Sequence, residues 1–498
     1  MLNSYHMKSR IDLRAYELTS LRARSGQLSV IILLFATVTA ILVSGFTLLA
    51  ASFLQLSSRA WNKSQAFAIA ESGIEYYRWH LAHAPADYED GTGHAGPYTH
   101  TYYNKDGTAI GTFILDITPP PAGSTVVTIE STGEVLADAS ISKIIKVQLG
   151  IESFSNYALA SEGNLYFGTG TIAYGPIFSN GGINFNGIAY GPIESALNTY
   201  SDPNDSNKTE WAVHTDLAPA DPQPPTAWNS RPDVFAGGRA VGIPTLDFTQ
   251  ITQTLSSIKS LAQASGTYYA SSSAYGYDLA LATSGVYSIY KVTSLAARPS
   301  GCTNTSNVSG WGTWSVGTES LAATGTIPAN GVLFVEDDLW VRGQISNKHL
   351  TIGAGRFPEN PSTWANITIN SSTLYTNYNG SDTLAYIAQN NFNVGLMSDD
   401  VLRIDGAVIS QNGRVGRYYY TPPNNSGNSN KCGPTVTRQK ITLFGSIFSN
   451  QPYQFGFNDG TGYQERDIIY DTNLLYTPPP SFPLTTDEYA QISWDEVQ

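Results

Sequence analysis

The stretch SVIILLFATVTAILVSGFTLLAASFLQL, residues 29–56, decides the fold of this 498-residue chain. No charged residue occurs from Ser25 to Ser58. An apolar helix of about 20 residues already crosses the roughly 30 Å hydrocarbon layer of a membrane. The stretch is also longer than the apolar region of about 7–15 residues in a secretory signal peptide. We therefore predict a transmembrane helix over residues 27–57.

Residues 1–26 form a basic leader in front of this helix. The leader carries five Lys or Arg side chains and two acidic ones. Positively charged flanks of a membrane helix stay on the cytoplasmic side. We therefore expect a single-pass membrane protein with a cytoplasmic N-terminus, whose bulk lies outside the cytoplasm at the cell surface.

The predicted helix continues beyond the membrane over residues 58–85. Apolar or small side chains recur at steps of three, four or seven residues, which places them on one stripe of a helix. Pro85 and the polar run that follows it end this pattern. The second half of the helix is thus amphipathic and needs a surface to cover its stripe. The stripe consists of Ala60, Phe67, Ala70, Ile74, Tyr77 and Leu81.

After the helix the periodicity changes to that of β-strands. Three β-rich runs are separated by turn residues, which is typical of an antiparallel meander. We expect residues 86–152 to form a small antiparallel sheet that rests on the amphipathic helix. The runs are GTFILDI (111–117), STVVTIEST (124–132) and ISKIIKVQLGI (141–151).

The N-terminal pattern resembles that of type IV pilin-like proteins, and specifically the PilX-type minor pilins. The resemblance covers residues 20–85. It depends on the basic leader that closes at Gly26, on the uncharged helix, and on the motif AESGIE at residues 70–75. The motif residues that carry it are Ala70, Glu71, Gly73 and Glu75.

This resemblance implies that a prepilin peptidase cuts between Gly26 and Gln27. It also implies that the helix anchors the chain in membrane lipid and packs against other pilin-like subunits of the pilus assembly machinery. Major pilins carry Glu at the fifth mature position, where this chain has Ile31. The usual register contact is therefore missing, which leaves open whether the leader is cleaved and whether the chain polymerises. The alternative is a plain membrane anchor with a helical stalk.

Residues 153–498 contain internal repeats. The phrase IAYGPI at 172–177 returns at 188–193, and IFSN occurs at 177–180 and 447–450. Short strands separated by Gly and Asn corners predict a β-solenoid-like exported domain, with a β-sandwich as the alternative. These repeats, with residues 331–345 and 481–497, also resemble the region found behind PilX-type N-termini.

A helical insertion interrupts the repeats at about residues 245–266. Its apolar side chains are Ile251, Leu255, Ile258 and Leu261, and we expect Asp247 or Thr245 to cap it. The helix should cover an open end or flank of the repeats, because exposed β edges invite pairing with other chains. The whole chain is then an α+β protein: a long helix with a small antiparallel sheet, followed by a large, mainly β domain.

The composition excludes several classes of function. Only 13% of the residues are charged, and the net charge is −13, whereas nucleic-acid binding needs clustered Lys and Arg. Two cysteines are too few for a cysteine-based zinc module. Cys302 and Cys432 both lie in Gly-, Asn- and Ser-rich loops on the exported side, where disulfides persist, and we predict that they form one.

No set of side chains predicts catalysis. Four histidines between His80 and His100 lie close in sequence, but nothing holds them around one metal ion. The acidic pairs at 337–338 and 399–400 are better explained as polar turns, since adjacent strand residues point to opposite faces. We therefore expect no enzyme activity, no cofactor and no metal.

The sequence thus predicts a membrane-anchored pilin-like subunit that takes part in filament assembly and displays a β domain at the surface. Tyrosine and asparagine side chains on that domain would suit a glycan or cell-surface ligand. Two alternatives remain: a membrane-tethered carbohydrate-active enzyme and a static envelope structural protein.

Overall fold

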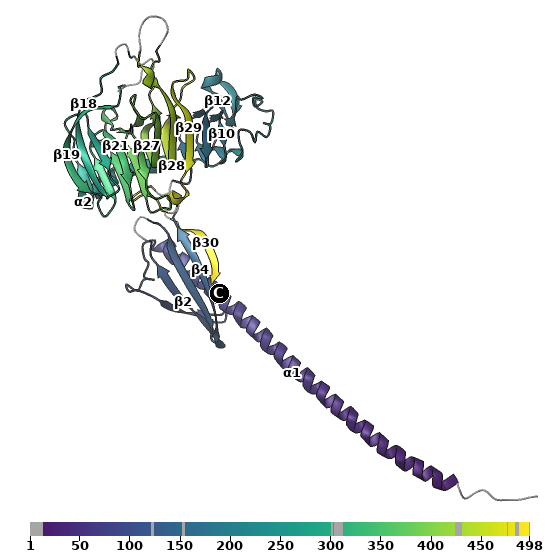
Figure 1. The fold of residues 1–498 in the computed structure, drawn as a ribbon. Coiled ribbons are helices and arrows are strands. Elements are labelled where there is room, and N and C mark those ends of the chain that lie inside the picture. The colour runs from purple at the N-terminus through teal and green to yellow at the C-terminus, as the bar shows by residue number, and fades with distance from the viewer. Residues whose placement is uncertain are drawn as a thin grey trace, which may run out of the picture.

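The computed structural model divides the protein into a helix–sheet module and a β domain (Figure 1). The helix–sheet module comprises residues 13–150 and 490–497, and the β domain comprises residues 159–475. For residues 13–26 and 249–254 only the backbone is described. The structure describes residues 13–120, 124–151, 155–299, 302, 312–423, 431–475, 477–483 and 488–497.

Helix α1 (Leu13–His83) is one unbroken helix of 71 residues. It begins within the predicted leader, continues through the apolar stretch and ends two residues before Pro85, which confirms the predicted C-terminal boundary. In Figure 1 the first part of α1 extends away from the rest of the molecule, and only its last turns lie against the sheet.

The sheet of this module has five antiparallel strands in the order β1-β2-β3-β4-β30. The three predicted runs correspond to β2, β3 and β4. Two further strands join the edges, and one of them comes from the C-terminus of the chain. The strands are β1 (Tyr98–Tyr103), β2 (Ala109–Thr118), β3 (Val127–Val135), β4 (Asp138–Gly150) and β30 (Ala490–Val497).

Strand β30 corrects the predicted domain boundary. The sequence predicts that all of residues 153–498 belong to the exported domain, but β30 pairs with β4 in the helix–sheet module. Its side chains are mostly exposed, so its sequence lacks the alternation that marked β2 to β4. The β domain is therefore inserted between two neighbouring strands of the module's sheet.

The β domain consists mainly of short strands in parallel pairing. Its strands are β5 (Leu159–Ser161), β6 (Leu165–Phe167), β7 (Thr171–Tyr174), β8 (Ile177–Ser179), β9 (Ile183–Phe185), β10 (Ile188–Ala189), β11 (Ile193–Ser195), β12 (Thr199–Asp202), β13 (Lys208–Trp211), β14 (Val213–His214), β15 (Arg239–Val241), β16 (Thr267–Tyr269), β17 (Tyr277–Leu281), β18 (Val286–Leu295), β19 (Val316–Thr326), β20 (Val332–Val335), β21 (Leu339–Ile345), β22 (His349–Ala354), β23 (Ile367–Thr368), β24 (Thr373–Tyr375), β25 (Thr383–Ala388), β26 (Phe392–Val394), β27 (Val401–Arg417), β28 (Thr437–Gln454) and β29 (Gly462–Tyr470). Short 3₁₀ helices lie at Pro203–Asp205, Pro361–Thr363, Pro434–Val436 and Thr472–Leu475.

The sequence repeats stack in register. Strand β7 pairs with β10 so that Ile172 lies beside Ile188, which aligns the two IAYGPI copies. The two IFSN copies lie on either side of β5, because β28 pairs with β5 and β5 pairs with β8. Strands from the start of the β domain therefore stack directly on strands from its end.

Helix α2 (Thr249–Ser265) lies over one flank of this stack, on β16, β20 and β22. Leu255, Ile258 and Ala262 are buried in the same cluster as Phe334 of β20. Two details of the prediction are wrong. The N-cap is Phe248, without a side-chain capping bond, and Leu261 is 42% exposed, because the buried stripe passes through Ala262 instead.

A disulfide joins Cys302 to Cys432 across 130 residues of sequence. Both cysteines are buried in a small cluster with Leu396, Tyr418 and Tyr420. The bond ties the loop beyond β18 to the loop between β27 and β28.

Candidate membrane anchor and assembly helix

The first half of α1 presents apolar side chains to its surroundings on every side. Gln27–His83 contains a segment long and apolar enough to cross a membrane. Leu33 and Phe46 are 69% and 70% exposed, and their neighbours are similar. In water such a surface would be strongly unfavourable, so it needs lipid or other helices around it.

The polar side chains in this half satisfy themselves within the helix. Thr39 donates its hydroxyl to the carbonyl oxygen of Phe35 (2.7 Å), and Ser44 donates to Ala40 (2.7 Å). Ser52 donates in the same way to Leu48 (2.9 Å). These bonds leave few polar groups to be solvated, which suits an apolar environment.

The predicted processing position lies inside α1. Gly26 and Gln27 are both helical, and the helix runs through them without a break. Ile31 at the fifth mature position is 56% exposed. The first twelve residues of the leader lie outside the described residues.

The motif at residues 70–75 has two faces. Ala70 and Gly73 are buried against the sheet, whereas Glu71 and Glu75 are exposed. Glu75 accepts a hydrogen bond from Arg78 (2.8 Å) on the exposed face. The small residues of the motif therefore serve packing within the subunit, and its carboxylates remain on the outer surface.

Glycines allow α1 to lie very close to the sheet. A Cβ at Gly73 would overlap the Ser131 hydroxyl of β3 and come within 2.9 Å of the Phe113 ring. A Cβ at Gly133 would overlap the Ala66 carbonyl oxygen and lie 2.5 Å from the Ala70 nitrogen. The helix and β3 thus meet backbone to backbone, which is possible only where side chains are absent.

A buried stripe completes this contact. Most of the predicted stripe is confirmed, but Ala60 is exposed, since the sheet covers only the helix beyond residue 65. Phe67 is half-buried and packs edge-on against Trp494 of β30, with ring centroids 5.9 Å apart. The fully buried members are Ala66, Ile69, Ala70, Ile74, Tyr77 and Leu81.

The histidines near the end of α1 form separate pairs. His80 Nε2 lies 3.0 Å from Asp87 Oδ2, and His100 Nε2 lies 2.7 Å from Asp90 Oδ2. Hydrogen bonds from backbone N–H groups, first that of Glu89, lower the pKa of Asp87, and His80 adds to this. Among the described residues, no three His, Cys, Asp or Glu side chains are placed to share a metal ion.

The first acidic pair holds loops together. Asp337 accepts hydrogen bonds from the backbone and hydroxyl of Ser272, and Asp338 accepts two from Asn366. Arg356 bridges both carboxylates. The second pair also joins separate segments, since Asp399 accepts a hydrogen bond from the backbone of Ser372 before β24, and Asp400 accepts one from the backbone of Gln439 in β28.

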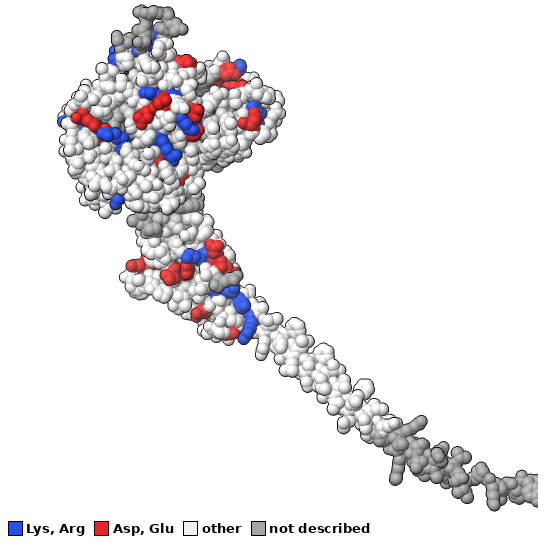
Figure 2. All heavy atoms as spheres, viewed as in Figure 1, with Lys and Arg blue, Asp and Glu red and all other residues white. Residues whose placement is uncertain are grey.

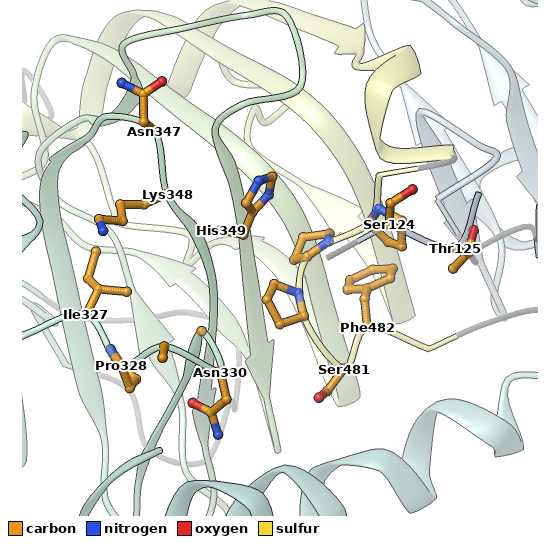
Figure 3. Close-up of a pocket in the computed structure, with 15 residues that line it drawn as sticks. Ser124, Thr125, Ile327, Pro328, Asn330, Asn347, Lys348, His349, Ser481 and Phe482 are labelled. Atoms are coloured by element: carbon orange, nitrogen blue, oxygen red, sulfur yellow. The ribbon is translucent and has the colours of Figure 1, made fainter. Parts of the chain in front are cut away.

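A cleft of about 540 Å³ lies where the two modules meet (Figure 3). Ser124 and Thr125 line it from the helix–sheet module, and His349 lines it from β22. Pro480 and Phe482 lie on the returning chain that leads to β30. Burial lowers the pKa of His349, which the nearby Asp382 carboxylate opposes. Nothing in this mixed lining selects a ligand, and the cleft is best described as the joint between the modules.

Charged side chains are sparse on the β domain. On the face shown in Figure 2, acidic and basic side chains lie next to one another, and most of the surface is uncharged. Many of these charges are ion pairs between strands, such as Lys440 with Asp467 (2.6 Å). This arrangement offers no basic surface on that face for nucleic acid.

Two strands of the helix–sheet module were not predicted from the sequence. Strand β1 lies beside β2, and β30 closes the other edge beside β4. For β30 the alternating apolar positions are absent, although Trp494 and Ile492 in a polar segment were a weak sign of a half-buried strand.

No protein-family model matches this sequence, and no curated protein matches it. Among solved structures, the crystal structure of the competence-associated pilin ComZ from Thermus thermophilus is similar to this chain, at 13% sequence identity. The match covers 88% of this chain and 97% of that chain, with a TM-score of 0.35.

Proposed function

We propose that this protein is a membrane-anchored, non-enzymatic, pilin-like subunit that takes part in the assembly of a type IV pilus-like filament. One observation carries the proposal: α1 exposes an apolar surface over its first half and packs its second half through glycines onto an antiparallel sheet. A plain anchor requires only the first half. A helix that is both anchored and rigidly joined to a sheet can transfer from lipid to a bundle of similar helices without unfolding.

In this proposal the leader is cytoplasmic and a prepilin peptidase cuts between Gly26 and Gln27, as in PilX-type minor pilins. Helix packing needs apolar surface but no carboxylate, so Ile31 is compatible with a place in a helical bundle. A subunit without the acid at this position loses one specific contact and would join a filament as a minor component, alongside subunits that carry it. The exposed carboxylates Glu71 and Glu75 lie where they can meet basic residues of neighbouring subunits.

The β domain is then the displayed part of the subunit, and we infer a β-solenoid-like stack adapted to adhesion. The register of the two IAYGPI copies supports such a stack, because each repeat covers the apolar face of the next. A domain that is inserted into an edge of the sheet can project from a filament without disturbing the helix contacts.

The N-terminus of the mature protein tests the processing step. The protein would be isolated from its native membrane, alone and in a strain without prepilin peptidase, and its first residues sequenced. We expect a start at Gln27 in the first case and an intact leader in the second. A chain that keeps its leader in both strains would instead be a static anchor or envelope protein.

Incorporation is tested separately. Surface filaments would be sheared from cells and probed for this protein in the wild type and in a Gly26→Val variant, in which a bulky side chain blocks cleavage. We expect the wild type in the filament fraction and the variant in the membrane fraction. Ser57→Val, which also introduces a valine at an exposed position of α1, serves as a control outside the processing position. Equal partition of wild type and variant would contradict the proposal.

A further inference from the structure

The β domain contains a second cleft, away from the joint between the modules, with a volume of about 740 Å³. Several segments of the chain build its walls: β6 with the loop after it, the loops after β9, β12 and β14, and the segment from the end of β28 into β29. The volume falls within the range of small-molecule sites and exceeds what one sugar ring fills. The AESGIE motif and the IAYGPI and IFSN repeats lie outside this cleft.

The lining combines aromatic rings with amide side chains. Tyr166 and Phe457 are half-buried at the wall, so each keeps part of its ring exposed. Phe457 is held edge-on by Tyr419 at 5.1 Å between ring centroids. The amides that line the cleft can both donate and accept hydrogen bonds. They are Asn186, Asn204, Asn458, Gln454 and Gln464.

One charged group in the cleft is available to a ligand. Asp216 is 55% exposed, and its Oδ2 accepts a hydrogen bond from Asn184 (2.7 Å) while its backbone N–H donates to Asn186 (2.9 Å). These two hydrogen bonds hold Asp216 in place at the wall of the cleft. Tyr453 also lines the cleft, but it is 96% buried and its hydroxyl is enclosed, so this hydroxyl is not available to a ligand.

The electrostatics of the cleft disfavour an anionic ligand. Arg466 is the cation among the described lining residues. Its guanidinium is already used by the carbonyl oxygens of Tyr463, Gln464 and Thr169 and by the Thr171 hydroxyl. Arg466 therefore fixes the wall of the cleft and leaves Asp216 as the charge that a ligand meets.

From this geometry we propose that the cleft binds a neutral oligosaccharide. Sugar rings have apolar C–H faces, which suit exposed aromatic rings, and hydroxyl edges, which suit amides and a fixed carboxylate. A purely apolar ligand would leave the amides and Asp216 unpaired, and such loss of hydrogen bonds is strongly unfavourable. The inference depends on the proposed surface display only for its biological use, because sugar binding is a property of the isolated chain.

The full-length protein would be purified in a detergent without a sugar headgroup and titrated calorimetrically with chitotetraose, cellotetraose and maltotetraose. We expect at least one of them to bind. Asp216→Asn should weaken this binding about tenfold, because an amide oxygen accepts a weaker hydrogen bond than a carboxylate. Phe457→Leu should weaken it about threefold, because it removes an aromatic face from the wall of the cleft. Phe457→Leu decides if Asp216→Asn fails to fold.

Matched controls lie nearby. Asp205→Asn changes a carboxylate that pairs with Lys208 in the loop between β12 and β13, and Tyr190→Phe changes an exposed tyrosine stacked on Tyr174 outside the cleft. Neither should alter binding. Absence of binding by all three sugars at millimolar concentration would overturn the proposal, as would binding that survives both cleft variants or is lost in Tyr190→Phe. Filament incorporation is measured separately, so either proposal can fail without the other.

Discussion

The two sheets of this protein bury their side chains in different ways. In the helix–sheet module, β3 alternates buried and half-buried residues, because α1 covers only one face of the sheet. In the β domain, nearly every residue of β27 is buried. Val408 faces the central core, and Ile409 faces the cluster beneath α2. One-sided cover gives alternation in the sequence, and two-sided cover removes it, as in the run at residues 406–409 of β27.

The two modules also use glycines in different contacts. In the first, glycines bring a helix onto a sheet. In the second, glycines bring neighbouring strands of a stack together, since a Cβ at Gly445 would overlap the Gly406 carbonyl oxygen. This difference predicts that each module can be damaged without the other, because distant sites contribute independently to stability.

The largest expected effect comes from the disulfide. Replacing both Cys302 and Cys432 by Ser should destabilise the β domain by about 5 kcal/mol, because the bond closes a loop of 130 residues in the unfolded chain. The helix–sheet module contains neither cysteine and should be unchanged. Chemical denaturation followed by hydrogen exchange in each module measures both. Equal loss of protection in the two modules would show that they unfold as one unit.

A smaller effect is expected at the contact between α1 and the sheet. Gly133→Ala should destabilise the helix–sheet module by about 3 kcal/mol, because the new Cβ meets the helix backbone on both sides and cannot be accommodated by a side-chain shift. Hydrogen exchange in β3 and β4 should rise while that of β27 and β28 does not. The control is Gly163→Ala, where the nearest atoms are 3.8 Å away.

The reciprocal change affects the stack. Gly445→Ala should destabilise the β domain by about 2 kcal/mol, since Gly445 has φ of +147° and lies against Gly406 of the neighbouring strand. Thermal unfolding of the β domain should shift downward while the helix–sheet module stays as it was. Gly168→Ala, with its nearest neighbour 3.8 Å away, should have little effect. A shift in both modules would contradict their independence.

The smallest effect depends on pH and concerns the β domain alone. Burial, and then the neighbouring Asp278, raises the pKa of Glu319 to about 7, although Arg342 contacts both carboxylates. An acid with a raised pKa stabilises the fold fully below its ordinary pKa, and this contribution is lost as the pH rises through about 7.

The Glu319→Gln variant removes this titration, because an amide can donate to Asp278 at any pH. The wild type should therefore lose about 1 kcal/mol more stability than the variant between about pH 5 and pH 8, after allowance for solvent screening. Urea denaturation at the two pH values measures the difference. Parallel pH dependence in both proteins would exclude Glu319 as its source.

The sequence predicted the helix and the central strands well, because both have a simple periodicity. The uncharged stretch and the stripe that ends at Leu81 predict α1. The alternation of apolar and polar residues predicts β2 to β4. The repeat IAYGPI correctly predicted that similar segments stack. The repeat could not predict that the first strands of the β domain stack on its last strands. The residues around β5 carry no pattern that identifies β28 as its neighbour.

The remaining differences have physical causes. Edge strands such as β30 and β19 expose most of their side chains, so they carry little apolar pattern. The cap of α2 depends on backbone geometry at Phe248 and not on residue type alone. The sequence could not predict the cleft that we propose to bind sugars, because its walls come from segments about 290 residues apart that only the stacked fold brings together.

The insertion of the β domain between β4 and β30 determines how mechanical load passes through the molecule. Gly150 at the end of β4 is paired with Ala490 at the start of β30, so both connections to the β domain leave from one point. A pull on the β domain is thus shared by two adjacent strands along their lengths, while α1 resists from the membrane side. When paired strands are pulled along their lengths, the hydrogen bonds between them must break together and not one after another. The paired strands at the junction therefore make an attachment suited to tension.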